Sequence, residues 1–350
     1  MQTKVIKIDK DNIDLAKIRE AANVIRKGGL VAFPTETVYG LGANALDETA
    51  VNKIFTAKGR PSDNPLIVHI SDRKSLSAIV KSIPENALIL MDKFWPGPLT
   101  IILKKSPGIP RIITAGLDSV AVRMPAHPIA LALINESGLP VAAPSANISG
   151  RPSPTDASHV IEDLMGKVDI IIDGGSTSVG LESTVLDLTA TPLTILRPGG
   201  VTKRRISDAL GGTEIISVSK TSEDLSSVPK SPGMKYIHYS PKAKVIIIDG
   251  EISKIVEKIN ELIGEYSNKN LTTGVLATKQ TKDLYNTSMV ISLGDRTRPE
   301  TIAGNLFHAL REFDRRNVDI IFAESIDKTG IGTAIMNRLS NAAGHNIIIV

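Results

Sequence analysis

Two basic residues, Lys58 and Arg60, stand in the segment KGRPSDNP at residues 58–65, where a predicted helix ends. Gly59 separates them and Pro61 stops the helix, so their side chains would enter one small volume instead of lying along a helix face. Arg60 can bind two phosphate oxygens at once and Lys58 supplies a point charge, which suits a phosphate group. The alternative is a solvated basic helix end, which the helix dipole also favours.

A loop rich in hydrogen-bond donors follows the predicted strand 141–143. Residues 142–153 read AAPSANISGRPS, with hydroxyls, an amide and an arginine between prolines. Ser145 and Asn147 are two residues apart in an extended segment, so their side chains point the same way. Such a loop suits a nucleotide or an amino acid, although its residues could also be ordinary turn formers.

Other polar residues also lie at or near strand ends, where open sheets bind ligands. The segment PTETVYGLG (34–42) follows the predicted strand 30–33, and Arg123 ends the predicted strand 120–123, where a guanidinium could meet a carboxylate. His69 could be either a ligand or a hydrogen-bonded histidine on a half-buried strand. No G-x-x-x-x-G-K-[ST] loop occurs, so any ATP would not be held by a P-loop.

Composition limits the classes of function. With 350 residues, 42% apolar and 22% charged, the chain is expected to be globular with room for two domains. The absence of cysteine excludes disulfides, thiolate nucleophiles and cysteine-held metals. The histidines form no H-x-H or H-x-x-x-H pair, so no metal site is expected from the protein itself, although phosphate-borne magnesium fits. Neither a membrane span nor a signal peptide is predicted, and we expect a cytoplasmic protein.

The apolar pattern predicts two α/β domains joined by a linker. Residues 1–212 combine a helix at 13–27 with strands that in several places leave no room for a crossover helix, so this sheet should be mixed. Residues 213–243, rich in Ser, Pro and Lys, are predicted to be a linker or lid. Residues 244–350 alternate strand and helix, which is typical of a smaller parallel, doubly wound, Rossmann-like sheet.

Seven segments, in this order, together resemble the YrdC-like threonylcarbamoyl-AMP synthase family. They are FPTETVYGLG (33–42), KGRPSDNP (58–65), WPGPLT (95–100), VRMP (122–125), APSAN (143–147), EST (182–184) and RPG (197–199). The segment SPGMKYIHYSP (231–241) and the C-terminal part are similar to the long, two-domain form of this family. The resemblance implies an open, twisted mixed sheet with a concave cavity, followed by the Rossmann-like domain.

The resemblance also implies a set of site residues. Catalytic roles fall on Lys58, Arg60, Ser145 and Asn147. Contacts to L-threonine fall on Thr37, His69, Arg123, Ala143 and Ser183. Contacts to ATP fall on Arg60, Asn64, Ser119, Ser145, Ser153, Arg197 and Tyr236. The two tyrosines and the histidine in 231–241 suggest a lid over a nucleotide, with docking of the two domains as the alternative.

The implied activity is that of an L-threonylcarbamoyladenylate synthase, a nucleotidyltransferase. Threonine and bicarbonate give a carbamate that attacks the α-phosphorus of ATP, and pyrophosphate leaves with the help of Mg²⁺. Such chemistry needs positioning and charge neutralisation more than a protein nucleophile. The product would serve the machinery that transfers threonylcarbamoyl to tRNA beside the anticodon.

Two other functions are weighed against this one. A double-stranded RNA-binding module would need a broad cationic surface, and a net charge of +4 over 350 residues supplies little, so only weak RNA binding stays open. The carbamoyl-adenylate domain of hydrogenase maturation proteins has a similar fold but accompanies cysteine-rich zinc modules. A chain without cysteine argues against that function.

Overall fold

The computed structural model describes residues 2–218 and 239–350. Contacts divide the chain into two compact units, one of Met1–Ser149 and Ser153–Tyr236 and the other of Gly150–Pro152 and Ile237–Val350. Most of the predicted linker or lid, including the 231–238 part of SPGMKYIHYSP, lies outside the described residues. Near its start, Ile215–Ser217 forms a strand and not a linker.

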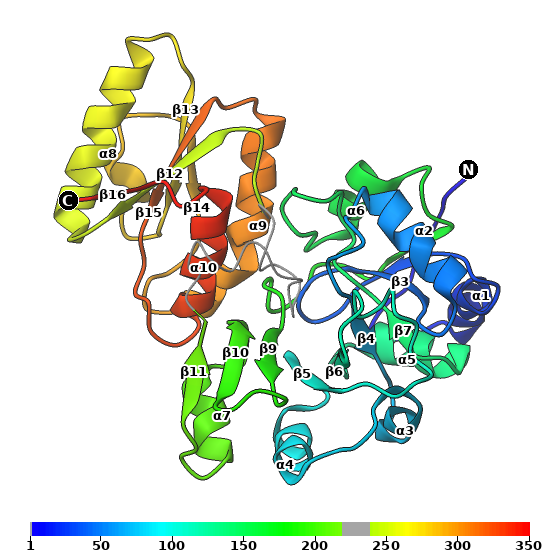
Figure 1. The fold of residues 1–350 in the computed structure, drawn as a ribbon. Coiled ribbons are helices and arrows are strands. Elements are labelled where there is room, and N and C mark those ends of the chain that lie inside the picture. Colours follow the sequence, from blue (N-terminus) through cyan, green and yellow to red (C-terminus); the bar gives the residue numbers. More distant parts are fainter. Residues whose placement is uncertain (1, 219–238) are drawn as a thin grey trace. The chain divides into compact units, whose positions relative to one another are not determined.

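The first unit contains helices and strands in irregular alternation (Figure 1). Its helices are α1 (Leu15–Arg26), α2 (Glu48–Lys58), the 3-10 helix η1 (Arg73–Ser75), α3 (Leu76–Ile79), α4 (Glu85–Phe94), α5 (Pro128–Ser137), α6 (Ala157–Leu164) and α7 (Lys203–Ala209). Its strands are β1 (Lys4–Lys7), β2 (Val31–Phe33), β3 (Gly40–Asn44), β4 (Ile67–His69), β5 (Leu99–Lys104), β6 (Ser119–Arg123), β7 (Val141–Ala142), β8 (Ile170–Asp173), β9 (Thr184–Asp187), β10 (Leu193–Arg197) and β11 (Ile215–Ser217).

These strands form one open sheet in the order β1-β8-β2-β3-β7-β4-β6-β5-β9-β10-β11. Parallel pairs such as β4–β6 and β5–β9 alternate with antiparallel pairs such as β2–β3 and β5–β6. The prediction of a mixed sheet is confirmed. The antiparallel β2–β3 hairpin was not among the predicted elements.

Helices cover both faces of this sheet over part of its width. Side chains alternate between the faces, so Val31 and Phe33 join α1 and α5 in one core, whereas Ala32 joins the larger core on the opposite face. That larger core takes in apolar side chains of α2, α4 and α6. Because both faces are buried, β2 is apolar along its whole length.

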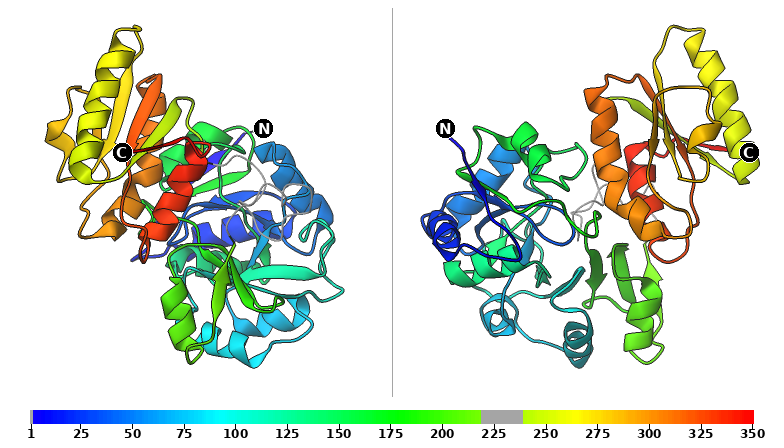
Figure 2. Two further views of the ribbon diagram at one scale, coloured as in Figure 1. Left: turned by 60° about the vertical axis from the view of Figure 1, so that its left-hand side comes forward. Right: turned by 180° about the vertical axis from the view of Figure 1, so that it is seen from behind.

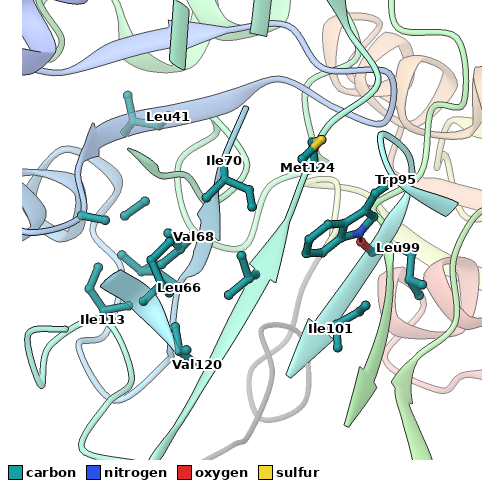
Figure 3. Close-up of a cluster of buried hydrophobic side chains, with 14 of the residues drawn as sticks. Leu41, Leu66, Val68, Ile70, Trp95, Leu99, Ile101, Ile113, Val120 and Met124 are labelled. Carbon is teal, nitrogen blue, oxygen red and sulfur yellow. Dashed lines mark hydrogen bonds between the residues drawn. The ribbon is translucent and has the colours of Figure 1, made fainter. Parts of the chain in front are cut away.

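The larger core also contains the only tryptophan of the sequence. Trp95 packs beside Leu99, Ile101 and Met124 (Figure 3), and its indole N–H donates to the Leu99 carbonyl at 2.7 Å. Burial of so large a ring with its polar atom bonded stabilises this part of the unit. The start of β5 and the residue that follows β6 are thereby fixed in place.

The second unit is a parallel sheet with helices on both faces (Figures 1 and 2). Its strands β12 (Lys244–Asp249), β13 (Thr273–Ala277), β14 (Val290–Ser292), β15 (Ile320–Glu324) and β16 (Ile347–Ile349) run in the order β14-β13-β15-β12-β16. Its helices are α8 (Ile252–Ser267), the 3-10 helix η3 (Lys282–Leu284), α9 (Pro299–Arg315) and α10 (Gly332–Ala342). Every pair in this sheet is parallel, which confirms the doubly wound prediction.

None of the helices in the described part of the chain has the length and apolar character that a membrane span needs.

Candidate active site

Several predicted site residues share one face of the first sheet. His69 and Arg123 are register partners across the parallel β4–β6 pair, and Ser119 lies four residues before Arg123, on the same side of β6. A small buried cluster of strand residues lies on this face, formed by Ile67, Ile102, Ala121 and Val185. The strands therefore gather polar side chains from distant parts of the sequence around an apolar floor.

A tight turn positions Thr37 beside Arg123. The Thr35 hydroxyl accepts the backbone N–H groups of Thr37 and Val38 and donates to the Val38 carbonyl at 2.7 Å. The Thr37 hydroxyl lies 2.8 Å from that of Thr35 and accepts from Arg123 Nη1 at 2.9 Å. The PTET segment is thus a fixed turn of hydroxyl groups at the carboxyl end of β2.

Arg123 is only 4% exposed, and its other nitrogens are also in contact with protein. Nε donates to the Gly97 carbonyl at 3.3 Å, and Nη2 lies 2.6 Å from Glu36 Oε2. The pair with Glu36 balances the buried charge of Arg123, which would otherwise be costly. Arg123 therefore stands at the end of β6 as predicted, and Glu36 is a neighbour that the sequence did not single out.

His69 is buried, 3% exposed, and uncharged near neutral pH. Burial and then the nearby Arg123 charge lower its pKa to about 3. Its Nδ1 lies 3.3 Å from the Ile67 carbonyl. Because a carbonyl can only accept, this contact assigns the proton to Nδ1 and leaves Nε2 as an acceptor. His69 is thus suited to a hydroxyl donor.

The EST and RPG segments meet through Arg197 and Ser183. Arg197 Nε donates to the Ser183 carbonyl and Nη2 to the Ser183 hydroxyl, both at 3.1 Å, and that hydroxyl lies 2.7 Å from the Thr100 hydroxyl. A β-carbon on Gly199 would lie 2.3 Å from the Thr184 nitrogen. Only glycine therefore lets the end of β10 approach the start of β9 so closely.

Lys58 holds the SAN loop in this structure. Helix α2 ends at Gly59, whose φ of 60° is in the left-handed region. The Lys58 side chain is 2% exposed, and its ammonium donates to the carbonyls of Ser145 and Asn147. Its own carbonyl accepts from Ser149 at 2.9 Å. Lys58 therefore contacts two other residues with predicted catalytic roles, while its contact with a phosphate stays a prediction.

Arg60 donates to the backbone of its own segment. Nη2 bonds the Pro65 carbonyl at 3.0 Å, and both Nε and Nη2 lie 3.3 Å from the Asn64 carbonyl. The Asn64 side-chain oxygen is buried and accepts no hydrogen bond from the described residues. This orphan acceptor fits a ligand that carries a donor.

The remaining predicted residues are placed as follows. Ser153 donates to Glu182 Oε1, and Tyr39, which follows the PTET turn, donates its N–H to the Pro154 carbonyl at 2.8 Å. Ala143 donates its N–H to the Ile67 carbonyl at 3.0 Å, beside the His69 strand. Tyr236 lies outside the described residues.

Sequence reasoning missed three buried polar residues that support this site: Glu36, Thr100 and Glu182. They lie in the segments FPTETVYGLG, WPGPLT and EST, close to strand ends. Their polar character at these positions could have identified them as site residues. No group of three or more His, Cys, Asp or Glu side chains able to hold a metal occurs among residues 2–218 and 239–350.

Two family models match the chain. One, described as "Telomere recombination" and covering the Sua5, YciO and YrdC proteins, matches residues 23–199. The other, described as "Threonylcarbamoyl-AMP synthase, C-terminal domain", matches residues 201–344. Together they span both structural units.

Individual relatives agree with these matches. The chain is 54% identical to the threonylcarbamoyl-AMP synthase of Pyrococcus abyssi, over 97% of this chain and 98% of that one. It is 52% identical to the threonylcarbamoyl-AMP synthase of Bacillus subtilis, over 95% of this chain and 94% of that one. The crystal structure of P. abyssi Sua5 complexed with L-threonine superimposes with a TM-score of 0.94 at 52% identity, covering 99% of this chain and 100% of that one. The chain therefore belongs to the two-domain threonylcarbamoyl-AMP synthase family, a family of enzymes.

Proposed function

We propose that this chain makes threonylcarbamoyl-AMP and pyrophosphate from L-threonine, bicarbonate and ATP, as a nucleotidyltransferase. One arrangement supports this activity above all. Arg123, buried at the end of β6, bonds Thr37 and is the register partner of neutral His69. A guanidinium, a hydroxyl and an imidazole acceptor together match the carboxylate and hydroxyl of threonine.

The amino-acid subsite is proposed around Arg123. Its guanidinium would hold the threonine carboxylate, and His69 Nε2 would accept a hydrogen bond from the threonine hydroxyl. The proposed threonine contacts are Thr37, His69, Arg123, Ala143 and Ser183. Ser183 is held by Arg197 and Thr100, which fixes its hydroxyl.

The nucleotide subsite is proposed around the remaining cations. Among the described residues of the first unit, Lys58, Arg60, Arg123 and Arg197 are cationic and buried. Such a concentration of buried positive charge in one unit suits a polyanionic substrate. The proposed ATP contacts are Arg60, Asn64, Ser119, Ser145, Ser153, Arg197 and Tyr236, and the proposed catalytic residues are Lys58, Arg60, Ser145 and Asn147.

The proposed reaction transfers AMP without a protein nucleophile. A carboxylate oxygen of N-carboxy-threonine bonds to the α-phosphorus of ATP as the bond to pyrophosphate breaks, so the cations serve to position and neutralise charge. The described residues form no metal-binding cluster of their own. Mg²⁺ would therefore arrive on the phosphate oxygens of ATP, as this ion commonly does.

The place of this reaction in the cell follows from its product. A mixed carbamic–phosphoric anhydride is a reactive acyl donor, so a transferase must consume it, and the proposed acceptor is tRNA. We propose a cytoplasmic site of action, where ATP, bicarbonate and tRNA are together. Direct contact with RNA is expected to be weak at a net charge of +4.

The test is release of pyrophosphate from ATP by the purified full chain, with the adenylate identified by mass spectrometry. Release should require both threonine and bicarbonate, and omission of either should abolish it. Serine should replace threonine better than valine does, because valine leaves buried polar groups of the pocket unpaired. Salt-dependent binding of double-stranded RNA without ATP turnover would instead favour the RNA-binding function.

A further inference from the structure

Glu36 occupies a fixed position inside the candidate site. It lies between Thr35 and Thr37 in the hydroxyl turn that follows β2. Its carbonyl accepts from the Val179 N–H at 2.8 Å and lies 3.4 Å from the Ser178 hydroxyl, so the segment 178–179 holds the Glu36 backbone. The direction of the Glu36 side chain is therefore set by the fold.

The Glu36 carboxylate is buried and incompletely bonded. Its side chain is 6% exposed, and Oε2 lies 2.6 Å from Arg123 Nη2, although this contact lacks hydrogen-bond geometry. Neither Oε1 nor Oε2 accepts a hydrogen bond from the described residues. A buried carboxylate oxygen without a hydrogen-bond donor destabilises a folded protein and is rare. A ligand that carries a donor would satisfy the Glu36 oxygens.

The charges of this pair match those of a free amino acid. Arg123 and Glu36 together carry no net charge, and an α-amino acid is a zwitterion with no net charge. In the proposed function Arg123 takes the carboxylate, which leaves Glu36 beside it as the only described anion in contact with Arg123. The ammonium and carboxylate groups of an α-amino acid are attached to the same carbon. They can therefore contact two ionic side chains that lie side by side, as Glu36 and Arg123 do.

We propose that Glu36 receives the α-ammonium group of the amino-acid substrate and so selects acids that carry a free α-amine. This inference rests on the proposed function, because it assigns a further contact in the same amino-acid subsite. Without the negative charge of Glu36, the buried Arg123 would bind any small hydroxycarboxylate of similar shape. Glu36 is then the residue that distinguishes threonine from its analogue with a hydroxyl at the α-carbon.

The experiment compares two ligands of equal shape by titration calorimetry on the full chain. The ligands are L-threonine and the 2,3-dihydroxybutanoate of the same configuration, in which a hydroxyl replaces the ammonium. In Glu36→Gln the affinity for threonine should fall about 10- to 100-fold, as expected for loss of one charged hydrogen bond. The affinity for the hydroxy acid should stay the same or rise, so the preference for threonine should collapse.

Three controls keep this result interpretable. Glu36→Asp keeps the charge and should keep the preference, even if both affinities fall. Glu324→Gln removes the same charge from another buried glutamate that is paired with an arginine, in the second unit, where Arg296 Nη2 lies 2.6 Å from Glu324 Oε2, and should leave both affinities unchanged. Thermal unfolding of each variant shows whether it is folded.

The outcomes separate this inference from the proposed function. If Glu36→Gln weakens both ligands equally, Glu36 acts only by holding Arg123 in place, and the inference is wrong while the proposed function stands. If the unmodified chain binds neither ligand, the amino-acid subsite itself is misassigned. Retention of the full threonine preference by a folded Glu36→Gln variant would also overturn the inference.

Discussion

At the scale of single residues, the site depends on which buried groups are charged. Arg123 is neutralised by Glu36, whereas its register partner His69 is uncharged because burial and Arg123 both oppose its protonation. A positively charged His69 would repel the neighbouring Arg123 and would also repel an incoming ammonium group. If the proposed amino-acid subsite is correct, binding of a zwitterion therefore requires the neutral imidazole.

The low pKa of His69 predicts how stability depends on pH. Its folded pKa of about 3 lies below the unfolded value near 6.5, so the neutral group contributes stability above pH 6.5. That contribution is lost as the pH falls from 6.5 toward 3, because His69 then binds a proton in the unfolded chain but not in the folded chain. In His69→Gln the loss of unfolding free energy over this window should be smaller, by about 1.4 kcal/mol per pH unit.

Urea unfolding between pH 7.5 and 4.5 measures this difference. Trp95 is the single tryptophan and is buried in the first unit, so its fluorescence reports the relevant transition. Asn52→Gln, at an exposed position on α2, serves as the control because it removes no titratable group, and it should keep the slope of the unmodified chain. Parallel profiles for the unmodified chain and His69→Gln would contradict the prediction.

The sequence predicted the position of some site residues but not the contacts between them. Arg123 at a strand end was predictable, because the apolar run before it defines the strand and its direction. The partners of Lys58 were not predictable from spacing, since Ser145 and Asn147 lie 87 and 89 residues away in sequence. The pairing of Glu36 with Arg123 depends on the same kind of long-range register.

At the scale of elements, the apolar strands were predicted and the atypical ones were missed. Strand β6 is an apolar run, and the structure places it within a residue of the predicted bounds 120–123. Strand β3 reads GLGAN, whose glycines have low strand propensity. Gly42 is required there because a β-carbon would lie 2.7 Å from Phe33, which is a tertiary reason that local sequence does not reveal.

Alanine in place of glycine should have opposite effects on stability at two positions of the chain. Gly199→Ala should destabilise the first unit by about 1–3 kcal/mol, because the new methyl would meet the backbone of Thr184 and Glu182 and push β10 from β9. It should also slow adenylate formation, since Ser183 and Arg197 would separate. Gly264→Ala lies in α8 with open space around it and should stabilise the second unit by about 0.5–1 kcal/mol.

Differential scanning calorimetry and pyrophosphate release measure these two effects on the full chain. Activity of Gly264→Ala should equal that of the unmodified chain. Unchanged stability and unchanged activity in Gly199→Ala would show that the EST and RPG segments can move apart without loss of the site.

At the scale of the whole molecule, the chain is not divided at one point. Residues 150–152 belong to the second unit although the first unit surrounds them in sequence. Fully buried Arg311 of α9 donates to the Pro152 carbonyl through Nε at 3.1 Å and Nη2 at 2.6 Å, and Ser240 donates its N–H to the Gly150 carbonyl. The sequence predicted a single boundary, because composition changes only at the linker.

Arg311 should therefore matter to both stability and activity. In Arg311→Leu the Pro152 carbonyl loses two donors, and we expect a loss of about 1–3 kcal/mol in stability. The segment 150–152 joins Asn147 to Ser153, both proposed site residues, so the KM for ATP should rise several-fold. Arg316→Leu is the control, since Arg316 follows α9 in an exposed pair with Glu312 and should change stability by less than about 0.5 kcal/mol. Equal behaviour of the two variants, by calorimetry and pyrophosphate release, would show that Arg311 has no such role.

The same contact sets an order of events during synthesis of the protein. Arg311 follows Pro152 by 159 residues, so the ribosome completes the rest of the first unit long before α9 emerges. Until then the carbonyls of Gly150 and Pro152 lack the hydrogen bonds that Ser240 and Arg311 donate to them. A nascent chain with its first sheet already folded should therefore bind ATP several-fold more weakly than the finished chain, and full activity should begin only when the second unit has been made.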